Sequence, residues 1–194
     1  MGKQLTRPLR PEGREGFSLV EVAIVTVLLL VAVGGLSGAV LSSLRLSRAT
    51  EESARADEAV RALAGRIHND GFGVLFQQYN ADPSDDLLGA GKAPGAAFDV
   101  PGLTARPDDP DGHVGRIVFP TVDLLGGKQA LREDVVDERL GMLAGVGRDL
   151  NGNGELPNDD QMTVGYVILP ARLIVEWTGA GGDRSYELDL VFVP

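Results

Sequence analysis

Residues 17–41 read FSLVEVAIVTVLLLVAVGGLSGAVL, a run of 25 residues in which Glu21 is the only charged side chain. As an α-helix rising about 1.5 Å per residue, this run would extend roughly 37 Å, more than the hydrocarbon core of a bilayer at about 30 Å. The run therefore predicts a single transmembrane helix. A carboxylate inside such a helix costs on the order of 2.5–3.5 kcal/mol on insertion scales, so we expect Glu21 to have a function.

The segment that precedes the apolar run is basic. Residues 1–16 carry four basic side chains and two acidic ones. Positive charge beside a span tends to stay in the cytoplasm, which predicts that the C-terminal bulk lies on the far side of the membrane. The alternative is a secretory signal peptide cut near residues 37–39, but the run is long for such a peptide and holds a carboxylate.

Gly16-Phe17-Ser18-Leu19-Val20-Glu21, after a basic leader and before an apolar helix, resembles the processing motif of type IV prepilins and type II secretion pseudopilins. The resemblance extends to about residue 45. It implies a leader over 1–16 that a prepilin peptidase removes after Gly16, and methylation of the new terminal amine at Phe17. It also implies that the Glu21 carboxylate pairs with the terminal amine of a neighbouring subunit.

The resemblance further implies partners and a location. The partners are the peptidase, other pilin or pseudopilin subunits and an inner-membrane assembly platform. The location is the bacterial inner membrane, crossed once, with the N-terminus cytoplasmic and the head periplasmic or external. The assembled form would belong to a periplasmic or cell-surface filament.

The helical pattern continues beyond the apolar run. Apolar side chains recur at spacings of three and four as far as Ile67, and Gly71 is a plausible stop, so we expect one helix over 17–70. Its first part is transmembrane and its second part amphipathic. Acids alternate with the arginines of the second part, and the net charge is −10, so we predict a solvated face and no nucleic-acid binding.

Residues 71–194 are long enough for one soluble head domain. Proline and glycine predict a loop over 81–111, and residues 131–143 suit a short helix. Alternating or β-branched residues predict four strands, over 115–119, 164–169, 172–177 and 185–192. The expected fold class is therefore α+β, with the long N-terminal helix packed on a C-terminal antiparallel sheet, which is also the layout that the resemblance implies.

Residues 149–160 of the head, DLNGNGELPNDD, have the spacing of a calcium-binding loop. Ca²⁺ takes six to eight oxygen ligands, and the pattern resembles EF-hand and dockerin loops. The expected ligands are Asp149, Asn151, Asn153, the backbone carbonyl of Glu155, and Asp160 or Asp159 in the last position. A plain Asn-Gly turn is the alternative, because these residue types are also the usual turn formers.

Nothing in the sequence predicts an enzyme. The chain has no cysteine, which excludes thiol nucleophiles and thiolate metal sites, and its two histidines stand apart from any triad or zinc pattern. The resemblance to prepilins and pseudopilins implies a structural subunit of a type IV pilus or a type II secretion-like filament. The alternative is a membrane-anchored calcium-binding or adhesive module that forms no filament.

Overall fold

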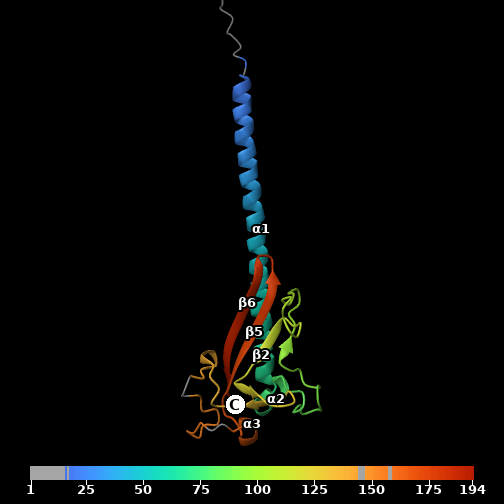
Figure 1. Ribbon diagram of the computed structural model, residues 1–194, viewed down its shortest axis with the longest axis vertical. Coiled ribbons are helices and arrows are strands. Elements are labelled where there is room, and N and C mark those ends of the chain that lie inside the picture. The colour runs from blue at the N-terminus through green and yellow to red at the C-terminus, as the bar shows by residue number, and fades with distance from the viewer. Residues whose placement is uncertain (1–15, 17, 144–146, 157–158) are drawn as a thin grey trace, which may run out of the picture. The chain divides into compact units, whose positions relative to one another are not determined.

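The computed structural model describes residues 16, 18–143, 147–156 and 159–194, and the chain divides into two units between Leu44 and Arg45. Helix α1, Leu19–Asn69, contributes to both units. The elements that follow it all belong to the second unit (Figure 1). The helix predicted over 17–70 is confirmed over Leu19–Asn69. Phe17, at the predicted start, lies outside the described residues.

In the first unit, every described side chain is exposed. Within the described part of the chain, α1 is the one helix long and apolar enough to cross a membrane, judged by length and composition. Glu21 lies in its first turn, where a carboxylate interacts favourably with the unpaired N–H groups of the helix terminus. The single candidate transmembrane helix expected from the sequence is therefore present.

In the second unit, the remainder of α1 packs on a sheet. Its side chains Ala56, Val60 and Ile67 are fully buried and belong to the hydrophobic core of the head. Their spacing is the one that the sequence predicts. On the opposite side of the helix, Arg55 pairs with Glu51 at 2.7 Å. This division of apolar and charged faces is that of an amphipathic helix lying on a core.

The sheet has four antiparallel strands in the order β1-β2-β5-β6. They are β1 Ala97–Phe98, β2 Gly115–Val118, β5 Leu169–Gly179 and β6 Gly182–Phe192. The long β5–β6 hairpin lies beside α1 (Figure 1), and along β6 Tyr186, Leu188 and Leu190 pack against the core while Glu187 and Asp189 are exposed. The α+β class and the strands predicted near 115–119, 172–177 and 185–192 are confirmed.

Two predictions for the head were wrong. Residues 164–169 are not a strand, because Asp160 caps the short helix α3, Gln161–Val164, and β5 begins only at Leu169. Residues 131–143 are not a helix, since the segment starts at the end of β4, Gln129–Leu131, and contains only the 3₁₀ turn η2, Glu138–Leu140.

Four further short elements were not predicted. Strand β3, Thr121–Asp123, pairs with β4 as a separate two-stranded hairpin. After α1 come η1, Phe72–Val74, and α2, Leu75–Tyr79, which buries Leu75, Phe76 and Tyr79. Strand β1 lies inside the segment predicted as a loop, and its two residues form the edge of the four-stranded sheet.

Candidate functional site

The first candidate site is at the start of α1. Gly16 is exposed and precedes the helix, near whose start Val22 N donates to Ser18 O at 3.1 Å. Phe17, the expected new N-terminus, and the leader residues 1–15 lie outside the described residues. Gly16 itself is exposed and outside regular structure, which is compatible with access by a peptidase.

The polar side chains of the apolar run differ in how they are satisfied. Thr26 Oγ1 donates to Val22 O at 2.8 Å, and Ser37 Oγ donates to Val33 O at 2.9 Å, so both hydroxyls are satisfied within the helix. The side chain of Glu21 makes no hydrogen bond or ion pair with any described residue. A carboxylate in an apolar environment needs a cationic partner, which this unit does not provide among its described residues.

The second candidate site is the predicted calcium loop, whose first half is a tight set of turns around Asp149. The carboxylate of Asp149 accepts backbone N–H bonds from Gly152 at 2.6 Å, Asn153 at 3.2 Å and Gly154 at 2.7 Å. These bonds lower the pKa of Asp149 below its ordinary value, and the bond from Gly154 has the largest effect. The carboxylate is therefore ionised at neutral pH.

The two asparagines of the loop repeat this geometry. Asn151 Oδ1 accepts from Asn153 N at 2.9 Å, and Asn153 Oδ1 accepts from Glu155 N at 2.7 Å. Gly152 and Gly154 have φ values of 77° and 79°, which permit the repeated turns. The structure thus brings Asp149, Asn151 and Asn153 into one compact turn. Both a calcium-binding loop and a plain Asn-Gly turn would have this arrangement.

The second half of the loop is arranged differently. Asp160 Oδ1 accepts from Met162 N at 3.0 Å and from Leu131 N at 3.1 Å, so this carboxylate caps α3 and ties it to β4. The side chains of Glu155 and Asp159 are exposed, and residues 157–158 lie outside the described part. Across the described residues, no three histidine, aspartate or glutamate side chains are grouped so as to hold a metal ion.

Sequence spacing did not identify Glu133, which lies beneath the loop. This side chain has no solvent exposure, and its Oε1 accepts from Leu150 N at 2.6 Å and Asn151 N at 3.1 Å. Its Oε2 is buried and has no hydrogen-bond partner among the residues that the structure describes. An unsatisfied buried carboxylate oxygen is costly, and the Glu133 carboxylate adds a hard oxygen donor at the backbone of Leu150 and Asn151. Because Glu133 precedes the loop by 16 residues, only the fold brings it there.

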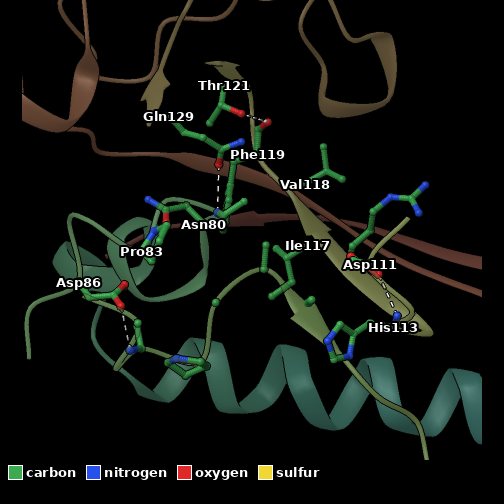
Figure 2. Close-up of a pocket in the computed structure, with 18 residues that line it drawn as sticks. Asn80, Pro83, Asp86, Asp111, His113, Ile117, Val118, Phe119, Thr121 and Gln129 are labelled. Carbon is green, nitrogen blue, oxygen red and sulfur yellow. Dashed lines mark hydrogen bonds between the residues drawn. The ribbon is translucent and has the colours of Figure 1, made fainter. Parts of the chain in front are cut away.

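A cavity of about 620 Å³ lies elsewhere in the head, between β2 and the segment that follows α2 (Figure 2). Its charged side chains are engaged: Asp86 accepts from Lys92 N at 2.9 Å, and Arg116 pairs with Glu176 at 2.6 Å. His113 lies 3.2 Å from Asp99. Apolar side chains of Ile117 and Phe119 form much of the remaining wall.

Comparisons of the chain with protein-family models, with curated proteins and with solved structures found no match. The likeness to pilins therefore rests on the N-terminal motif and on the arrangement of a long apolar helix followed by an antiparallel sheet.

Proposed function

We propose that this protein is a structural subunit of a type IV pilus or a type II secretion-like filament. In this proposal the chain inserts in the inner membrane through α1, is cut after Gly16 by a prepilin peptidase, and then packs against other subunits through its apolar helix. The Glu21 carboxylate pairs with the methylated amine that Phe17 presents on the neighbouring subunit.

The observation that carries the proposal is the state of α1 between Leu19 and Leu44. Every side chain there is exposed, large aliphatic ones included, and the hydroxyls of Thr26 and Ser37 are satisfied within the helix. This surface can contact lipid after the chain inserts in the membrane and can contact the apolar helices of other subunits after assembly. Glu21 is the exception, and the ammonium group released by cleavage after Gly16 is the cation that it needs.

The mature N-terminus tests the proposal. The full chain is expressed with a prepilin peptidase, and its N-terminal peptide is identified by mass spectrometry. We expect a chain that begins at methylated Phe17, and we expect Gly16→Val to stay uncut because a side chain obstructs the approach that glycine leaves open. Gly13→Val is the matched control in the same leader and should be cut normally.

Other N-termini would favour other functions. An intact leader contradicts the filament proposal and favours the anchored module, and a cut near Ala39 favours a secreted protein. Either result would be read on the wild-type chain, so it does not depend on how the variants fold.

A second function, calcium binding by residues 149–160, is supported by Glu133 Oε2 beside the loop, which has no hydrogen-bond partner among the described residues. The other oxygen ligands would be the ionised carboxylate of Asp149, the amide oxygens of Asn151 and Asn153, and the backbone carbonyl of Glu155. These oxygens suit a hard cation. Calcium bound there would join the loop to the buried Glu133 and brace a head that has no disulfide.

A further inference from the structure

The turn around Asp149 contains the two Asn-Gly sequences of the chain, Asn151-Gly152 and Asn153-Gly154. Asparagine loses its side-chain amide most readily before glycine, because glycine has no side chain to hinder its own backbone nitrogen, which attacks the asparagine Cγ. The two sites share this sequence and lie in one turn. A large difference in reactivity between them must therefore come from their surroundings in the fold.

The backbone is nearly the same at the two sites. Gly152 N donates to Asp149 Oδ1 at 2.6 Å, and Gly154 N donates to Asp149 Oδ2 at 2.7 Å. The two glycines have φ values of 77° and 79°. The side-chain oxygen of each asparagine accepts from the backbone N–H two residues further on, at 2.9 and 2.7 Å. Neither the attacking nitrogens nor the amide oxygens distinguish the two sites.

The side-chain amide nitrogens do distinguish them. Asn151 Nδ2 donates to Gln161 Oε1 at 2.8 Å, and Gln161 is fully buried, with its own Nε2 donating to Asp159 O at 3.2 Å. The amide of Asn151 is thus held at both its oxygen and its nitrogen. Asn153 is exposed, and its Nδ2 makes no hydrogen bond with any described residue.

This difference affects the first step of amide loss. Attack makes Cγ tetrahedral and turns the amide nitrogen out of its plane. At Asn151 that movement breaks the bond to Gln161 and leaves a buried acceptor oxygen without its partner, which is costly. At Asn153 the amide nitrogen already faces water and can move without breaking a bond to a described residue.

We infer that Asn153 is a deamidation site and that Gln161 protects Asn151 from the same reaction. The backbone nitrogen of Gly154 gives its proton to solvent base and bonds to Cγ of Asn153. The bond from Cγ to Nδ2 breaks, and the nitrogen takes a proton from water and leaves as ammonia. Water then opens the cyclic imide at one of its two carbonyl carbons, which yields aspartate or isoaspartate.

The aspartate product changes the charge of the turn. A carboxylate at position 153 still offers an oxygen to Glu155 N, and it adds a second negative charge beside Asp149. The affinity of calcium loops depends on how many of their ligands are charged, so this product should bind calcium more tightly. The increase in affinity rests on the calcium binding proposed above, whereas the reaction at Asn153 does not.

Peptide mapping tests the inference. The full chain in neutral detergent is incubated at mildly alkaline pH in ¹⁸O-labelled water and then digested in ordinary water at acidic pH. The label marks only asparagines that react during the incubation, and electron-transfer fragmentation assigns it to one position. We expect label at position 153 at least tenfold faster than at position 151. Equal rates, a faster reaction at 151, or no label at 153 would overturn the inference.

The unfolded chain provides the reference. In urea the bond between Asn151 and Gln161 is lost, so the two rates should come within threefold of each other. A difference that is as large in the unfolded chain as in the folded one would show that the sequence causes it and that Gln161 protects nothing. This measurement uses the wild-type chain and does not depend on how any variant folds.

Two variants of Gln161 examine the protection directly. Gln161→Leu removes the acceptor and should raise the rate at Asn151 at least fivefold, with the rate at Asn153 within twofold of the wild type. Gln161→Glu keeps an acceptor oxygen and should leave Asn151 slow. Emission of Trp177, the only tryptophan, verifies the fold of each variant. A folded Gln161→Leu chain with a slow Asn151 contradicts the protection.

A calcium titration separates this inference from the proposed calcium function. Asn153→Asp reproduces the aspartate product in every molecule, and we expect its Kd for calcium to be at least threefold lower than that of the wild type. An unchanged Kd refutes the effect of the product on affinity. A chain that reacts at Asn153 but binds no calcium refutes the calcium function and leaves the deamidation site in place.

Discussion

The indole of Trp177 on β5 donates a hydrogen bond from Nε1 to Oε2 of Glu52 on α1 at 3.3 Å, across 125 residues of sequence. The carboxylate of Glu52 also accepts from Ala180 N, with distances of 3.3 and 3.4 Å to its two oxygens. One side chain of the helix thus holds both the end of β5 and the turn that leads into β6. This contact joins α1 to the hairpin within the second unit.

Removing the Glu52 carboxylate should destabilise the head. Glu52→Ala leaves the N–H groups of Trp177, which is 1% exposed, and Ala180 without their acceptor, and we expect a loss of about 1–3 kcal/mol. Denaturant unfolding of the full chain in detergent, followed by Trp177 emission, measures it. Glu52→Gln keeps an acceptor oxygen and should lose less, and Glu58→Ala, exposed on the same helix, should lose almost nothing. Equal losses for Glu52→Ala and Glu58→Ala would contradict the assignment.

Two glycines near the calcium loop form a matched pair. Gly147 and Gly154 have φ values of 59° and 79°, so alanine strains both backbones by about 1–2 kcal/mol. At Gly147 the new Cβ would also lie 2.2 Å from the carbonyl oxygen of Glu133, whereas at Gly154 it meets nothing within 4 Å. We therefore expect Gly147→Ala to be clearly the less stable variant in denaturant unfolding without calcium. A Gly154→Ala variant that is equally destabilised would show that the close approach to Glu133 does not matter.

Calcium should stabilise the head if residues 149–160 bind it. At a concentration a hundredfold above Kd, the expected gain is about 2.7 kcal/mol, which corresponds to roughly 5–11 °C in Tm for a chain of this size. Thermal unfolding of the full chain with calcium, with magnesium and with excess chelator measures the effect. A transition that calcium and chelator leave unchanged would identify residues 149–155 as a plain turn.

Variants of the loop test which oxygens take part. Asp149→Asn should abolish the calcium response, because Asp149 carries the only charge in the turn over residues 149–153. Glu133→Gln keeps an acceptor for the N–H groups of Leu150 and Asn151, so it should fold while responding less to calcium. An unaltered response in Glu133→Gln would exclude the buried carboxylate from the site.

Glu21 should be required for assembly and not for insertion. We expect Glu21→Gln to reach the membrane and be cut after Gly16 normally, while the filament fraction released by shearing falls at least tenfold. The reason is that the neutral amide cannot neutralise the terminal ammonium of a neighbour. Thr26→Val is the control, since the Thr26 hydroxyl is satisfied by its own helix. Normal filaments from Glu21→Gln would show that the carboxylate has another role.

The sequence by itself determined those features whose signals are local in the chain. The apolar run, the spacing of Ala56, Val60 and Ile67, and the alternation along β6 each follow from the period of a helix or strand, so α1 and the main hairpin were predictable. The prepilin-like motif and the first half of the loop around Asp149 were also visible as short patterns. Local patterns failed at 164–169, where capping by Asp160 overrides the apolar residues that suggested a strand.

Only the tertiary structure decided which distant side chains meet. Glu52 reaches Trp177, Glu133 is buried beneath Asn151, and Gln129 on β4 bonds to Ala81 and Asp82 in the segment after α2. Periodicity identifies the face on which a residue lies, but not the segment packed against that face. Burial of the shared core brings these segments together, and the polar groups carried inward must then find partners wherever the chain places them.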